Sequence, residues 1–351
     1  MPVKIALIAP PFIAVPPKRY GGTELFAAEL AAGLQKRGVS VVLYANGASR
    51  AGVETRWLYE KEEWPIPGTV ESSLKTLTHS SWAVKDASAE ADVIHLNDVQ
   101  GLSFCRFVAL PFVYTVHHVF DPALAQFYGT LPQNIDYVTI SDFQRRELAR
   151  PRMRTIHHGI DVASYQVRER KQPYLVFLGR IAPAKGTHLA IEIAEKTGIP
   201  LKIAGEIQPI YKEYWETVVK PKVDGRFIEF IGEVGREEKS ELLGNARALL
   251  FPIQWEEPFG LVLIESMACG TPVLAMPGGS VEEIVKEGVS GHIRRSVTEL
   301  AECVKNLNLD ARKVREYAEQ NFSADRMAED YIQLYRQVIA CRTAETERSV
   351  A

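Results

Sequence analysis

Short apolar runs alternate with longer amphipathic segments along the first 160 residues. After a Pro-rich loop, apolar positions recur at helical spacing from about Thr23 to Arg37, and Gly38 closes that segment. Residues 48–88 predict loops with one helix. The apolar runs are typical of buried strands and are Lys4–Ala9, Val41–Ala45, Val93–Leu96, Phe112–Val116 and Tyr137–Ile140. Strands that alternate with helices predict a parallel sheet covered on both faces.

The second half of the chain repeats this alternation with strands of its own. Its apolar runs are Tyr174–Leu178, Leu201–Ala204, Phe227–Ile231, Ala248–Phe251 and Val273–Ala275. Two α/β units of similar size predict two doubly wound, Rossmann-like domains that face each other across a cleft, with ligands beyond the carboxyl ends of the strands. We expect one domain over residues 1–160 and a second over 161–323. Helical stretches at Ala311–Gln320 and Ala324–Arg342 close the chain.

Composition narrows the class of protein. The chain has 351 residues, which is enough for two full cores, and its 46% hydrophobic content is that of a globular protein. A net charge of −3 gives no sign of nucleic-acid binding. The four cysteines are scattered without metal-ligand spacing, so they suggest a reducing, cytoplasmic compartment. The apolar start is too short for a signal peptide, and no segment approaches the ~20 apolar residues that span a membrane.

The stretch from Trp255 to Gly270, WEEPFGLVLIESMACG, carries the most specific chemistry. It places Glu257 and Glu265 eight positions apart, the first in a predicted loop and the second about one turn into a predicted helix. A helix start presents unpaired N–H donors, so we expect an anion site at Phe259, Gly260 and Leu261. Phosphates would take these N–H groups, and the carboxylates would accept hydrogen bonds from hydroxyls. Without this context, two glutamates at such spacing more often lie on a solvated helix face.

The context is a long motif. The segment E-P-F-G-L-x-x-x-E-x-M-A-C-G-T-P-V resembles the signature of the family 4 retaining glycosyltransferases, which share the two-domain GT-B fold. The resemblance implies that the second domain binds a nucleotide-diphosphate sugar, with Glu265 near the ribose and Glu257 near the sugar hydroxyls. It also implies that the last helix, about 324–342, crosses back to the first domain, where the acceptor enters. An apolar stripe suits that helix: Met327, Tyr331, Leu334, Tyr335 and Val338.

Two cations follow the first strand of the second domain. Arg180 ends the run F-L-G-R, and Lys185 comes five residues later. Both resemble the family's pair for the donor diphosphate, where positive charge stabilises a leaving group whose negative charge grows in the transition state. The alternative is that Arg180 pairs with a surface carboxylate and that Lys185 is solvated.

A glycine pair opens the first long helix. In G-G-T-E, Gly22 would let the backbone approach a phosphate or sugar, and Thr23 or Glu24 would complement the helix start. The motif resembles the family's glycine-rich loop, and a plain glycine turn with an N-cap is the alternative. No G-x-G-x-x-G follows the first strand, which argues against an NAD-dependent dehydrogenase.

Three histidines lie near predicted strand ends of the first domain. His117, in T-V-H, resembles the family's T-x-H element, and it could hydrogen-bond a sugar hydroxyl or steady forming charge. His118 departs from the family pattern and is an acceptor-side candidate. His95, in D-V-I-H-L-N-D, is a further acceptor-side candidate, with a structural role as its alternative. Five arginines between Arg145 and Arg154 suit a solvated helix end, or else a weak peripheral membrane contact or an anionic acceptor.

These residues predict a metal-independent retaining glycosyltransferase that moves a hexose-type sugar from a UDP- or GDP-sugar to a hydroxyl of a sugar, lipid-linked or small-molecule acceptor. No Asp-x-Asp-like pair stands at a plausible site, so we expect no metal ion. We also expect no other cofactor and no obligate protein partner. The catalytic candidates are Glu257, His117, Arg180 and Lys185. The donor-binding candidates are Gly22, Gly205, Ile231, Glu233, Phe259, Gly260, Leu261 and Glu265. The alternatives are a sugar-nucleotide epimerase of the same fold and a non-catalytic sugar-nucleotide-binding protein.

Overall fold

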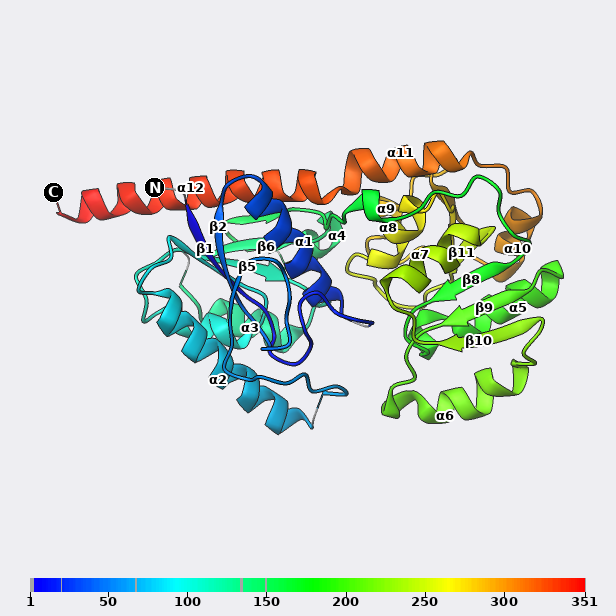
Figure 1. The fold of residues 1–351 in the computed structure, drawn as a ribbon, viewed down its shortest axis with the longest axis horizontal. Coiled ribbons are helices and arrows are strands. Elements are labelled where there is room, and N and C mark those ends of the chain that lie inside the picture. The colour runs from blue at the N-terminus through cyan, green and yellow to red at the C-terminus, as the bar shows by residue number, and fades with distance from the viewer. Residues whose placement is uncertain (1–2, 20, 67, 133–134, 149, 351) are drawn as a thin grey trace. The chain divides into compact units, whose positions relative to one another are not determined.

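The computed structural model describes residues 3–19, 21–66, 68–132, 135–148 and 150–350 (Figure 1). The chain divides into two compact units. Unit 1 comprises Met1–Pro17, Gly21–Gly159 and Ala324–Ala351, and unit 2 comprises Lys18–Tyr20 and Ile160–Ser323. Each unit is built around its own parallel sheet.

In the described part of unit 1, seven strands form one parallel sheet in the order β3-β2-β1-β4-β5-β6-β7. In chain order the strands are β1 (Lys4–Ile8), β2 (Ser40–Tyr44), β3 (Glu54–Arg56), β4 (Val93–Leu96), β5 (Phe112–Val116), β6 (Asp136–Thr139) and β7 (Met153–Thr155). The five strands predicted from apolar runs are confirmed to within one residue at each end. The strands β3 and β7 were not predicted, because both are three-residue edge strands without an apolar run.

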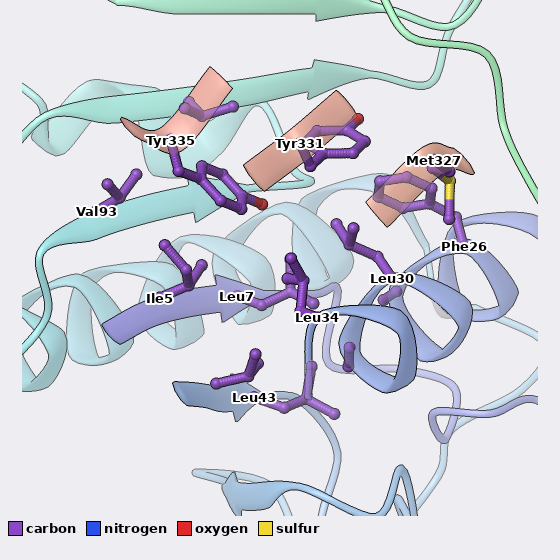
Figure 2. Packing of buried hydrophobic residues seen from close by; sticks show 14 of the residues in the cluster. Ile5, Leu7, Phe26, Leu30, Leu34, Leu43, Val93, Met327, Tyr331 and Tyr335 are labelled. Carbon is purple, nitrogen blue, oxygen red and sulfur yellow. The ribbon is translucent and has the colours of Figure 1, made fainter. Parts of the chain in front are cut away.

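Alternate residues of β1 supply the two faces of the unit 1 core. Ile5 and Leu7 pack on the side of α1 (Gly22–Lys36) and α12 (Ala324–Val350), where Figure 2 shows Tyr331 and Tyr335 of α12 beside them. Ala6 and Ile8 belong to the cluster on the other face. The predicted apolar stripe of the last helix is confirmed, because all five of its residues are buried.

The remaining helices of unit 1 connect successive strands. They are α2 (Thr69–Ala87), α3 (Pro122–Gly129) and α4 (Asp142–Leu148), with a 3-10 turn at η1 (Gln100–Phe104). The close packing of α1 on α12 depends on Gly33, since a Cβ there would lie 2.7 Å from the Ala328 Cβ. None of the helices in the described ranges combines the length and apolarity that crossing a bilayer requires.

In the described part of unit 2, six parallel strands follow the order β10-β9-β8-β11-β12-β13. They are β8 (Leu175–Leu178), β9 (Leu201–Ala204), β10 (Ile228–Gly232), β11 (Ala248–Phe251), β12 (Val273–Ala275) and β13 (Gly291–Ile293). The last, another three-residue edge strand, was not predicted. The longer helices are α5 (Thr187–Thr197), α7 (Arg236–Asn245), α8 (Leu261–Ala268), α10 (Val297–Lys305) and α11 (Ala311–Phe322). The shorter ones are α6 (Lys212–Tyr214) and α9 (Val281–Ile284), and the brief 3-10 and π turns are η2 (Val162–Ser164), η3 (Pro183–Lys185), η4 (Pro209–Tyr211), η5 (Trp215–Val219) and η6 (Lys220–Lys222).

Both strand orders contain a topological switch point. In unit 1 the chain leaves β1 for β2 on one side, while β4 pairs on the other. In unit 2 the chain leaves β8 for β9 on one side, while β11 pairs on the other. Ligands of doubly wound sheets bind at such points, beyond the carboxyl ends of the strands. In unit 2 the loops that follow β8 and β11 lie at this point.

Candidate active site

The loops after β8 and β11 bring two of the predicted site residues into direct contact. Lys185 ends the turn η3 after β8, and Glu257 lies between β11 and α8. The Lys185 Nζ lies 2.5 Å from the Glu257 Oε2, and the two side chains are only 16% and 9% exposed. The chain therefore places a nearly buried ion pair at the switch point of unit 2.

The indole of Trp255 contacts both members of this ion pair. The Trp255 Nε1–H donates to the same Glu257 Oε2 over 3.0 Å, and the Lys185 ammonium lies 4.4 Å from the Trp255 ring centroid. Burial lowers the pKa of Lys185, the Glu257 carboxylate opposes this shift, and the positive charge of Arg180 adds to it. Arg180 is thus close enough to influence Lys185, and its own guanidinium donates to the Gln208 Oε1 over 3.3 Å.

Two glycines allow the loops to approach so closely. Gly186 has a φ of 73°, and a Cβ there would lie 1.9 Å from the carbonyl oxygen of Pro252, the residue just after β11. Gly279 has a φ of 60°, and a Cβ there would lie 2.2 Å from the Glu257 carbonyl oxygen. Any side chain at either position would push the loops apart, so both glycines fix the backbone on which Lys185 and Glu257 stand.

The second signature carboxylate has a similar pair of partners. Glu265 lies in α8 and is 3% exposed. Its Oε1 accepts from the Lys239 Nζ at 2.7 Å and from the Tyr165 hydroxyl at 2.9 Å. Lys239 comes from α7 and Tyr165 follows the turn η2, so three separate segments of unit 2 meet at this carboxylate.

The predicted start of α8 is confirmed. Gly260 is its N-cap with a φ of 83°, and Leu261 is its first residue. Phe259 is 1% exposed and its ring packs against Phe322, so its side chain belongs to the core and only its backbone is available for a ligand. Gly270 follows the helix with a φ of 67°, as a C-terminal glycine cap does.

The other donor-side candidates lie at neighbouring strand ends. Ile231 is in β10 and is 40% exposed, and Glu233 follows that strand. Gly205 follows β9 with a φ of 148°, and a Cβ there would lie 1.8 Å from the Gly179 carbonyl oxygen. Close backbone packing alone therefore accounts for glycine at this position, and a role of Gly205 in donor binding stays a prediction.

In unit 1 the glycine pair opens α1 as predicted, and the left-handed backbone conformation belongs to Gly21. Gly21 is the N-cap with a φ of 146°, whereas Gly22 is the first helical residue. A Cβ on Gly21 would lie 2.9 Å from the Glu24 Oε2. Glu24 is buried, and burial raises its pKa to about 7.

His117 follows β5 as predicted. The amide of Asn97 donates its Nδ2–H to the Ile8 carbonyl, so its Oδ1 faces the His117 Nε2 at 2.9 Å and accepts from it. The His117 ring stacks on His158 with 5.6 Å between centroids. Burial lowers the pKa of His117 to about 3, which keeps the ring neutral at physiological pH. With Nε2 as its donor, its Nδ1 is an acceptor.

The ring of His118 is hydrogen-bonded at both nitrogens. Its Nδ1 lies 2.7 Å from the Val119 carbonyl and must donate to it. Its Nε2 therefore accepts from the Tyr128 hydroxyl at 2.6 Å. Burial lowers the pKa of His118. Both ring nitrogens bind the protein, so an acceptor contact through this ring would have to displace one of these bonds.

The expectation that His95 lines the site is wrong. The ring is 0% exposed inside β4, and both nitrogens are satisfied, by the Thr115 Oγ1 at 2.7 Å and by the Tyr335 hydroxyl at 2.7 Å. Thr115 also bonds the Tyr331 hydroxyl at 2.8 Å. This network ties α12 to the middle of the sheet, and burial lowers the pKa of His95 to about 3. Its role is structural.

Four of the five arginines near α4 contact other residues of unit 1. Arg145 pairs with Asp142, Arg152 pairs with Asp136, Arg154 donates to Gln337, and Arg150 donates to the Tyr128 carbonyl. These contacts suit the arginines of a solvated helix end, and a membrane contact stays a prediction. Among the described residues, no group of three or more His, Cys, Asp or Glu side chains could hold a metal ion. Independence from metal stays a prediction.

Family models match both halves of this architecture. A model described as glycosyl transferases group 1 matches residues 164–323, and one described as glycosyltransferase family 4 matches residues 20–164. The chain belongs to the group 1 glycosyltransferases of family 4. In this glycosyltransferase the first model covers the loops with Lys185, Glu257 and Glu265, and the second covers His117. The prediction of the family is confirmed.

Known proteins resemble this glycosyltransferase along nearly its whole length. Alpha-maltose-1-phosphate synthase of Mycolicibacterium smegmatis is 26% identical, over 93% of this chain and 97% of that protein. The structure of sucrose-phosphate synthase from Thermosynechococcus elongatus is 20% identical with a TM-score of 0.81, over 97% and 100% of the two chains. HepE of Anabaena, solved in complex with UDP-glucose, is 18% identical with a TM-score of 0.73, over 95% and 99%. The predicted GT-B fold is confirmed.

Sequence reasoning missed three residues that contact the signature carboxylates. Trp255 lies inside the motif, but nothing in the pattern showed that its N–H turns toward Glu257. Lys239 and Tyr165 lie 26 and 100 positions from Glu265. Only the fold brings them to that carboxylate, and no local motif marks them.

Proposed function

We propose that this glycosyltransferase transfers a hexose-type sugar from a UDP- or GDP-sugar to a hydroxyl group, with retention of anomeric configuration and without a metal ion. The acceptor is a sugar, a lipid-linked sugar or a small molecule, and the setting is the cytoplasm. One observation carries the proposal. Unit 2 places Lys185, Arg180 and Glu257 in the loops that follow β8 and β11, and the helix α8 that begins after the second loop carries Glu265. The contacts of both carboxylates leave hydrogen-bonding capacity unused.

The carboxylates suit the hydroxyl groups of a nucleotide sugar. The Glu257 Oε2 and the Glu265 Oε1 each bind two donors of the protein. The Glu257 Oε1 and the Glu265 Oε2 accept no hydrogen bond from the residues in the described ranges. A sugar hydroxyl at Glu257 and a ribose hydroxyl at Glu265 would fill these acceptors.

The cations suit the diphosphate. Lys185 and Arg180 would supply the positive charge that other phosphate-transfer sites take from a metal ion. The start of α8 at Gly260 adds N–H donors and the positive end of the helix dipole. Because the charge of the leaving diphosphate grows as the glycosidic bond breaks, these groups would stabilise the transition state more than the bound donor. The complex of HepE with UDP-glucose supports UDP-sugars as the donor class.

The acceptor would bind unit 1. His117 presents a neutral ring whose Nδ1 can accept a hydrogen bond from a hydroxyl, while Asn97 fixes the orientation of that ring. A ring with a pKa of about 3 remains an acceptor over the whole physiological range. In this arrangement His117 positions the reacting hydroxyl and carries no charge of its own.

Thermal unfolding with a panel of nucleotides tests the donor class. UDP, GDP, ADP, UDP-glucose and GDP-mannose are added in EDTA. A ligand at one hundred times its Kd should stabilise the native state by about 2.7 kcal/mol. We expect one base to raise the Tm, with loss of the shift in Lys185→Met. Lys196→Met, which removes a surface lysine of α5, should keep it. If no member of the panel raises the Tm of the wild type, the proposal fails.

A further inference from the structure

Trp255 contacts both members of the ion pair at the switch point. Its N–H donates to the Glu257 Oε2 over 3.0 Å, and its ring lies under the Lys185 ammonium at 4.4 Å from the centroid. Neither the family match nor the motif assigns this residue a role. The side chain is half-buried, so it is neither a core residue nor a freely solvated one.

The two donors at Glu257 differ in what a diphosphate would do to them. Lys185 is a cation, and an incoming diphosphate would attract it away from Glu257. The indole N–H is neutral and serves only as a donor, so the diphosphate attracts it far less strongly than it attracts the ammonium. The nearly buried Glu257 would then keep one protein donor on Oε2, while Oε1 faces the ligand.

The backbone holds the indole in this position. Gln254, next to it, donates its backbone N–H to the Ala184 carbonyl over 2.8 Å. The loop between β12 and α9 also packs closely against this segment, because a Cβ on Gly278 would lie 2.6 Å from the Trp255 carbonyl oxygen. The backbone hydrogen bond from Gln254 to Ala184 therefore joins the loop of Trp255 to the loop of Lys185 independently of the ion pair.

We propose that Trp255 is a positioning residue that keeps Glu257 directed at the donor sugar when Lys185 turns to the diphosphate. This inference rests on the proposed function. Trp255 acts through Glu257, so it should matter for the sugar part of the donor and not for the diphosphate. The chain would thereby distinguish a nucleotide sugar from the nucleotide alone.

Calorimetric titration of UDP and UDP-glucose, or of the GDP pair if that base binds, measures this effect as the ratio of the two Kd values. Trp255→Phe keeps an aromatic ring for Lys185 but removes the N–H. Loss of a hydrogen bond to a charged group should lower the preference for the nucleotide sugar about tenfold, while the Kd of the diphosphate stays within about twofold. Trp255→His, whose Nε2–H can take the place of the indole N–H, should restore most of the preference.

Three controls make the result decisive. Trp57→Phe removes an exposed indole of unit 1 and should change neither Kd. In a Glu257→Ala background, which has no acceptor for the indole N–H, Trp255→Phe should have no further effect on the ratio. Trp255→Met is a second donor-free variant in case the Phe variant does not fold. An unchanged preference in the donor-free variants, or an equal loss in Trp255→His, would overturn the inference. If the wild type binds neither ligand of either pair, the proposed function fails instead.

Discussion

The ion pair between Lys185 and Glu257 yields a prediction whose size can be worked out. Removing one partner of a buried pair costs about 3–5 kcal/mol, because the other charge stays buried without compensation. In Lys185→Met the carboxylate keeps the Trp255 N–H, so we expect a loss at the low end, about 3 kcal/mol. In Glu257→Gln the ammonium keeps the Trp255 ring at 4.4 Å, and we expect a loss of about 2 kcal/mol.

The double variant should be more stable than the sum of these losses implies. With both charges removed, only the packing differences remain, and we expect a total loss of about 2 kcal/mol instead of about 5. The coupling energy of the pair is then about 3 kcal/mol. Urea unfolding of the four proteins, followed by circular dichroism, measures it.

The surface pair of Lys196 and Glu192 on α5 is a matched control. Its atoms are 3.7 Å apart and its side chains are 44% and 48% exposed, so its coupling energy should be below about 0.5 kcal/mol. If the losses at Lys185 and Glu257 add within about 0.5 kcal/mol, the two groups do not depend on each other and the reasoning is refuted.

Other variants test other parts of the structure. Below pH 6.5 the unfolded chain protonates His95 and the folded chain does not, so this histidine makes the protein less stable as the pH falls. The variant His95→Gln lacks this effect. Measured by urea unfolding, it should therefore destabilise the protein by about 2 kcal/mol less at pH 5 than at pH 7. Gly186→Ala should lower the free energy of unfolding, obtained from thermal unfolding, by more than about 3 kcal/mol. Gly198→Ala, at a φ of 68° with open space around it, should lower it by about 1 kcal/mol. Equal losses in the two variants would contradict the steric argument. Lys239→Met should destabilise the protein by about 2 kcal/mol in urea, since Glu265 keeps only one donor, and a loss below about 0.5 would show that the pair contributes little.

The buried centre of each sheet was predictable because apolar runs mark strands that are covered on both faces. The strands β3, β7 and β13 were not, because an edge strand of three residues needs no apolar run and takes its place from its neighbour. The start of α8 was also predictable, since Gly260 and Gly270 mark both of its ends.

Side-chain partners were beyond the reach of the sequence. His95 and His117 both lie near the ends of apolar runs, but the first is satisfied by Tyr335, which is 240 positions away. The positive φ of Gly21 likewise could not be predicted from the sequence, and a ligand contact at Gly22 stays a prediction. In each case the deciding contact comes from the fold and leaves no mark on the local pattern.

Hydrolysis of the donor tests the central claim most directly, because water can replace an unknown acceptor. The nucleotide sugar that stabilises the protein is incubated with it in EDTA, and proton NMR follows the anomeric signal of the sugar before it mutarotates. We predict slow release of the sugar with the anomeric configuration of the donor, and loss of that release in Glu257→Ala. First release of the opposite anomer, conversion of the nucleotide sugar to an epimer, or equal rates in wild type and variant would contradict the account.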